Sequence, residues 1–200
     1  MVGMRILEGL VTTVDAQGRL NVAPMGPEVE DADLGRFVLK PFLGSTTLAN
    51  LRTTGVGVFH VTDDALMLAR AALGLETEPA TRPAEVICGR ILLGACRYRE
   101  FRVVSDDRGE PRPRLEVEAV AGGTLRDFFG WNRAQHAVVE AAILATRVGI
   151  VPWPRLLSEL EALRPLVEKT GGRDERVAYS LLVEHVRAAY GATQDRGGTT

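Results

Sequence analysis

The feature that most constrains this chain is a change of residue pattern near Gly122 and Gly123. Before this glycine pair, short apolar runs alternate with turn-forming residues, whereas apolar residues after about residue 124 recur at helical spacing. The 200 residues, 46% of them hydrophobic, are enough for one sizeable core with a helical appendage. We therefore expect an α+β, mainly β fold, with a β domain over residues 1–122 and a helical C-terminal extension over residues 123–200.

Six strands are expected in the β domain. Turn residues at 15–18 and 106–109 predict two hairpins. Gly89 and Gly94 are expected to bend the longest strand, which helps a sheet curl into a barrel. The loop expected at the surface covers residues 75–85. The expected strands are residues 5–14, 19–23, 36–41, 55–61, 86–104 and 114–120.

Five helical segments are expected from capping residues and apolar periodicity. Those at residues 45–51 and 63–70 are expected to cross the ends of the barrel. Three more, at residues 131–148, 154–169 and 174–190, make up the C-terminal extension. Pro165 is expected to kink or stop the second of these three helices.

The charge balance argues against polyanionic partners. With 24 basic and 26 acidic residues the net charge is −2, so no global field attracts nucleic acid or anionic lipid. The chain starts without a signal-like pattern, and it has no run of about 18 apolar residues. We expect a cytoplasmic protein that binds neither nucleic acid nor membrane.

The three histidines are scattered, without the spacing of metal ligands, so no metal site is expected. His60 lies in an apolar strand, where a hydrogen-bonded core or interface histidine is the usual outcome.

The segment from Asn21 to Pro27 ends a strand with Pro24, Gly26 and Pro27 in quick succession. Its backbone leaves the ladder with exposed N–H and C=O groups, which can hydrogen-bond a flat polar ring. The alternative is a simple strand exit.

A second candidate segment is Gly44 followed by Ser45, Thr46 and Thr47, which opens a helical turn after an apolar strand. Unpaired N–H groups and the helix dipole favour an anion there, and a phosphate would fit. The alternative is that Ser45 or Thr46 only caps the helix. The segment is not a Walker A loop, because it lacks the preceding glycine and the lysine.

The helix expected at residues 131–148 places Arg133, His136, Glu140 and Arg147 along one side, opposite a face of small residues. The alternatives are ordinary surface ion pairs, or an arginine that reaches a cofactor phosphate or an anionic substrate.

Several motifs, in order along nearly the whole chain, resemble the flavin reductase-like FMN-binding split barrels. Within these proteins, the resemblance is closest to a subfamily whose members are described only as having a domain of unknown function. The matching runs are residues 8–13, 23–26, 41–47, 50–51, 61–64, 132–134, 140–143 and 146–147.

This resemblance implies a homodimer of six-stranded antiparallel split β-barrels, with FMN at the subunit interface. It implies ring contacts near residues 21–26 and phosphate contacts near residues 45–47. The candidate cofactor residues are Asn21, Ala23, Pro24, Met25, Gly26, Ser45, Thr46, Thr47, Asn50 and Arg133.

The chain departs from many flavin reductases in lacking their Gly-Asp-His element near the nicotinamide site. The electron donor, whether NAD(P)H or another partner, therefore stays open, and no catalytic residue is assigned. The expected function is that of an FMN-dependent oxidoreductase of unknown substrate. The alternatives are a non-catalytic FMN carrier or sensor, a dimeric binding module, and a barrel that holds another flat cofactor.

Overall fold

The computed structural model describes residues 4–30, 34–75, 78–108 and 112–197, and for residues 193–197 it describes the backbone alone. The chain forms two compact units. The first comprises residues 1–63 and 78–128, and the second comprises residues 64–77 and 129–200.

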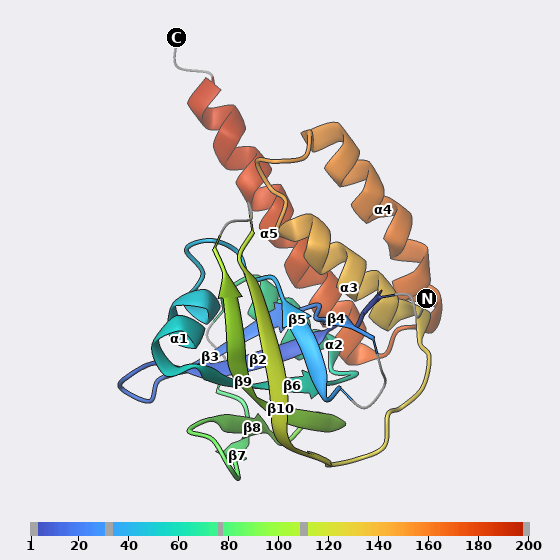
Figure 1. Ribbon diagram of the computed structural model, residues 1–200. Coiled ribbons are helices and arrows are strands. Elements are labelled where there is room, and N and C mark those ends of the chain that lie inside the picture. The colour runs from blue at the N-terminus through green and yellow to red at the C-terminus, as the bar shows by residue number, and fades with distance from the viewer. Residues whose placement is uncertain (1–3, 31–33, 76–77, 109–111, 198–200) are drawn as a thin grey trace. The chain divides into compact units, whose positions relative to one another are not determined.

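The described part of the first unit is built on an antiparallel sheet of eight strands in the order β1-β4-β5-β10-β9-β6-β2-β3, which curls into a half-barrel (Figure 1). A separate hairpin of two strands, β7 and β8, lies beside it. The sheet strands are β1 (Arg5–Ile6), β2 (Gly9–Val14), β3 (Leu20–Met25), β4 (Glu28–Val29), β5 (Arg36–Leu39), β6 (Val56–Val61), β9 (Arg97–Asp107) and β10 (Arg114–Thr124), and the hairpin strands are β7 (Thr81–Pro83) and β8 (Arg90–Leu92).

The sheet is buried on both faces at β6, because successive strand residues point to opposite sides. Phe59 belongs to the core inside the curl, where its ring centroid lies 5.7 Å from that of Phe37. The preceding residue, Val58, packs on the opposite face with Ile91 and Tyr98. The β7–β8 hairpin thus covers a second, smaller core.

The expected count of six strands is wrong for this sheet, and the reason is strand length. The strands β1 and β4 have two residues each, too few to show a period of two in the sequence. The expected strand at residues 86–104 is instead β8, a turn and most of β9. Residues 81–83 of the expected surface loop form β7.

Gly122 and Gly123 lie inside β10, where they pair with Arg99 and Tyr98. A Cβ atom at Gly122 would come within 2.6 Å of the Arg99 side chain, and one at Gly123 within 2.9 Å of the Tyr98 ring. These glycines therefore allow close packing and do not end the strand. The domain boundary expected after residue 122 stays a prediction.

Within its described residues, the second unit contains four helices: α2 (Ala65–Ala72), α3 (Arg133–Ala145), α4 (Trp153–Thr170) and α5 (Arg173–Gly197). The small-residue face of α3 is buried, as the spacing predicts. Helix α2 packs on α3 and α5, and the expectation that it crosses a barrel end stays a prediction. Pro165 lies inside α4 and does not stop it. Five residues before the proline, the Leu160 carbonyl accepts a bond from the Tyr179 hydroxyl at 2.6 Å.

Candidate functional site

A buried network of four polar side chains joins helix α1 (Thr46–Thr54) to the β2–β3 hairpin, beside which it lies in Figure 1. Asn21 donates from Nδ2 to the hydroxyl oxygens of Thr13, at 3.2 Å, and Thr47, at 3.0 Å. Asn50 donates to the same Thr13 oxygen at 3.0 Å. Thr13, Thr47 and Asn50 are at most 6% exposed. The network therefore fixes the start of α1 against the strand that carries Asn21.

Three of the predicted site residues, Asn21, Thr47 and Asn50, thus meet in one place. The residue that joins them, Thr13, was not among the predicted site residues. The strand pattern indicates Thr13, because this residue shares the inward face of β2 with Val11, a member of the barrel core. A hydroxyl on an apolar face needs a polar partner.

The start of α1 has a side-chain cap and backbone N–H groups that no helical carbonyl accepts. Gly44 has a positive φ of 78°, and the next residue, Ser45, accepts a bond from the Leu48 N–H at 3.2 Å. Capping by Ser45 is therefore confirmed. The N–H groups of Thr46 and Thr47 are the first two of the helix and lack an acceptor within it. They remain available for an anion, while the Thr47 hydroxyl is engaged by Asn21.

Strand β3 lies at an edge of the described sheet and pairs with β2. Pro24 fits such a position, because it has no N–H to offer a further strand. Ala23 lies half-buried beside it. The Met25 side chain packs against the barrel core, and a Cβ atom at Gly26 would meet Ile6 at 2.7 Å and Glu8 at 3.1 Å. These two residues thus contribute packing, and the backbone edge remains for a ligand.

Arg133, the tenth candidate, belongs to the helical unit. It is the first residue of α3 and is exposed, as are His136 and Glu140. Arg147 lies beyond the C-cap residue Thr146. Arg133 belongs to the second unit, whereas the other nine candidates belong to the first.

His60 is confirmed as a hydrogen-bonded core histidine. It is completely buried, Nδ1 lies 3.3 Å from the Leu10 carbonyl oxygen, and Nε2 accepts from the Leu92 N–H at 3.0 Å. Burial lowers its pKa from 6.5 to about 4, although the bond to Leu10 acts in the opposite direction. The side chain is therefore neutral at pH 7 and ties β8 to β6.

Two other kinds of site receive no support from the described part of the chain. No group of three or more potential metal-ligating side chains occurs among the described residues. Within the same residues, no helix is both long enough and apolar enough to cross a bilayer. A hollow of about 480 Å³ lies between α4 and α5, lined by Leu160, Glu161 and Arg187 among others, and contains no candidate site residue.

Comparison with protein-family models gives two matches in succession along the chain. The model described as the N-terminal domain of a protein of unknown function, DUF447, matches residues 7–126. A second model, described as protein of unknown function DUF447, matches residues 132–184. The chain belongs to the DUF447 family. A search of the curated proteins returns no match.

Solved structures that are similar to this chain include an FMN-bound DUF447 protein from Methanosarcina mazei. It has 21% identity and a TM-score of 0.78, over 92% of this chain and 96% of that one. The flavin reductase of a Pseudomonas putida styrene monooxygenase has 12% identity and a TM-score of 0.51, over 60% and 82%. A 2-nitrobenzoate 2-nitroreductase of Pseudomonas fluorescens has 20% identity and a TM-score of 0.51, over 62% and 66%. The resemblance to a subfamily of unknown function among flavin reductase-like proteins is confirmed.

Proposed function

We propose that this DUF447 protein binds FMN and works as an FMN-dependent oxidoreductase. The observation that carries the proposal is the likeness, over 92% of the chain, to a family member whose crystal structure contains FMN. The chemistry of the described residues fits this cofactor. FMN combines a flat ring with hydrogen-bonding edges and a phosphate. The first unit offers the edge strand β3, whose Asn21 donates to Thr47 at the N-terminus of α1.

In this proposal, the backbone of residues 23–26 on β3 binds the ring, and the N–H groups of Thr46 and Thr47 bind the phosphate. Asn21, Asn50 and Thr13 fix these two segments relative to each other through their side-chain bonds. The bound isoalloxazine supplies the redox chemistry, and the protein supplies binding and orientation.

Replacing Thr46 with proline is expected to weaken FMN binding about 10-fold, because it removes one N–H donor from a charge-assisted bond. Proline is tolerated at the first helical position. The preceding residue, Ser45, has φ −71° and ψ 147°, the extended conformation that proline requires of its neighbour. Titration of flavin absorbance or fluorescence measures the dissociation constant.

The matched control is Thr46→Ala, which keeps the N–H and loses only an exposed hydroxyl. We expect the alanine variant to bind FMN within about 3-fold of the wild-type protein, since exposed hydroxyls contribute little. If Thr46→Pro and Thr46→Ala bind FMN equally well, the phosphate lies elsewhere. A wild-type protein that retains no flavin would refute the proposed cofactor.

The same proposal includes a homodimer in which a second copy covers the FMN. Its support is that the β3 edge and the α1 N-terminus line neither the hollow between α4 and α5 nor the one along α5. A site completed by a partner would be open in this way. Light scattering on the FMN-loaded protein is expected to give the mass of two chains, and a monomeric mass would contradict this part of the proposal.

Turnover distinguishes an oxidoreductase from an FMN carrier. A carrier binds FMN but oxidises NADH or NADPH no faster than free FMN does, whereas an oxidoreductase exceeds that rate with its proper donor. Anaerobic reduction of the FMN-loaded protein, followed at the flavin absorbance bands with each donor in turn, makes this comparison.

A further inference from the structure

The phosphate site proposed above lacks a counter-charge of its own. A phosphate monoester carries about −1.5 to −2 charges at pH 7. The first helical turn of α1, residues 46–49, contains no basic side chain. Backbone N–H groups alone would therefore face a nearly dianionic group, and a nearby cation would add strength and selectivity.

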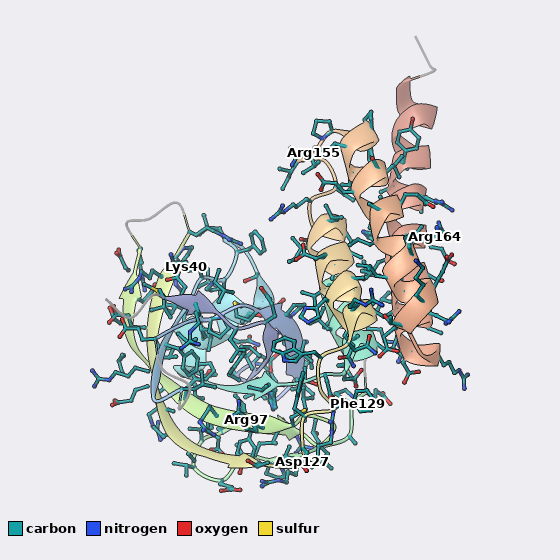
Figure 2. All side chains as sticks on the ribbon, turned by 90° about the vertical axis from the view of Figure 1, so that its right-hand side faces the viewer. Lys40, Arg97, Asp127, Phe129, Arg155 and Arg164 are labelled. Atoms are coloured by element: carbon teal, nitrogen blue, oxygen red, sulfur yellow. The ribbon has the colours of Figure 1, made fainter. Side chains whose placement is uncertain are left out.

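Two cations near this helix are already engaged. Arg52 is in the last turn of α1, the wrong end for an anion at the N-terminus, and it makes two bonds to the Asp106 carboxylate at 2.9 and 3.1 Å. Lys40, labelled in Figure 2, pairs with Glu28 at 2.9 Å. Neither is well placed to neutralise a phosphate.

Arg112 is different. Its guanidinium carbon lies 3.9 Å from the centre of the Phe42 ring, and no described carboxylate forms an ion pair with it. Phe42 is part of the turn that leads into α1, because its carbonyl accepts the Ser45 N–H at 3.1 Å. The ring is 60% exposed, so the guanidinium rests on an open aromatic surface directly before the helix start.

A guanidinium on an exposed aromatic ring gains only about 0.5–1 kcal/mol from that contact. The guanidinium can therefore leave the ring and form a bidentate hydrogen bond to a phosphate, because its planar set of N–H donors matches the spacing of the phosphate oxygens. Resting on the proposed FMN function, we propose that Arg112 binds the FMN phosphate and makes the site select FMN over riboflavin, the same flavin without its phosphate.

The experiment measures the dissociation constants of FMN and riboflavin for the wild-type protein, Arg112→Ala and Arg108→Ala. Arg108 is the control because it belongs to the same hairpin and is exposed, but pairs with Asp106. The expected result is a 10- to 100-fold weaker binding of FMN by Arg112→Ala, with riboflavin binding changed less than about 2-fold. Arg108→Ala is expected to leave both constants nearly unchanged.

Two results would overturn the inference, and they are distinguishable from each other. If the wild-type protein binds FMN but Arg112→Ala changes the FMN and riboflavin constants by the same factor, or changes neither, Arg112 does not bind the phosphate and the proposed function stands. If the wild-type protein binds no FMN, both the inference and the proposed function fail. Thermal unfolding without flavin checks that the variants are folded, and Arg112→Lys, which keeps the charge, is expected to recover part of the FMN affinity.

Discussion

Replacing Glu100 with alanine is expected to lower the free energy of unfolding by about 3–5 kcal/mol. Glu100 lies on β9 and is completely buried. Its carboxylate accepts the N–H groups of three successive residues: Glu85 at 2.6 Å, Val86 at 2.8 Å and Ile87 at 3.2 Å. Bonds to a charged acceptor contribute about 1.5–3 kcal/mol each, and a buried donor left without a partner costs about 1–3 kcal/mol. Glu85 and Val86 are exposed and Ile87 is buried, so water can replace the carboxylate at the first two N–H groups. The total loss of stability is therefore smaller than the sum of three buried bonds.

Glu100→Gln separates the loss of charge from the creation of a cavity. One carboxylate oxygen accepts from Glu85 and the other from both Val86 and Ile87. An amide has one oxygen, so its NH₂ group must face at least one of these donors. We expect Glu100→Gln to cost about 2–3 kcal/mol and to speed hydrogen exchange at residues 85–87.

Denaturant unfolding measures both variants against Glu118→Gln, a carboxylate on β10 whose bond to Arg36 is exposed. A surface ion pair of this kind contributes about 0–1 kcal/mol, so the control should be nearly as stable as the wild-type protein. A Glu100→Gln variant with wild-type stability would mean that the loop at residues 84–89 is held by other contacts, such as the Tyr98 hydroxyl bond to Glu85.

Glu100 also shows where prediction from sequence reaches its limit. Its partners are backbone N–H groups, which every residue except proline carries, so no residue type marks the contact. The segment around it was expected to be one long strand, because its apolar residues suit a strand throughout. The structure divides the segment into β8, a turn and β9, and the buried carboxylate holds the loop before β8.

The helical part was more predictable for a physical reason. A helix of three or more turns repeats its apolar face several times, so the expected helices at 131–148, 154–169 and 174–190 agree closely with α3, α4 and α5. The pattern of α2 was also recognised, but it does not tell which neighbour covers its apolar face. Which helices pack against α2 depends on residues elsewhere in the chain.

The candidate site was predictable to the same extent. Ser45 and its cap follow from local spacing, and local rules describe such a turn well. The bonds of Thr13 to Asn21 and Asn50 connect residues 8 and 37 positions apart, and local spacing does not reveal them. Arg112 lies still further from Phe42 along the chain, and only the folded structure places the two together.

His60 is expected to make the stability of the protein fall by about 3 kcal/mol as the pH is lowered from about 6.5 to about 4. The Leu92 N–H donates to Nε2, so the hydrogen of the neutral ring is on Nδ1 and points to the Leu10 carbonyl. Protonation would place a second hydrogen against the Leu92 N–H and charge a fully buried ring. Burial therefore lowers the pKa of His60 from 6.5 to about 4.

The sign follows from the number of bound protons. Between pH 6.5 and 4 the unfolded chain protonates this histidine and the folded chain does not, so lower pH favours the unfolded state. The contribution of His60 is complete above about pH 6.5 and is lost by about pH 4. The difference between the two pKa values, at about 1.36 kcal/mol per pKa unit, gives about 3 kcal/mol.

His60→Gln tests this because a glutamine oxygen can still accept the Leu92 N–H but does not titrate. Carboxylates titrate in the same pH range in every variant, so the informative quantity is the difference from the wild-type protein. We expect His60→Gln to lose about 3 kcal/mol less stability between pH 6.5 and 4, whatever its stability at pH 7. A His60→Gln curve parallel to the wild-type curve would show that the folded protein protonates His60 as readily as the unfolded chain, and the β6–β8 contact would then have to accommodate a charged ring.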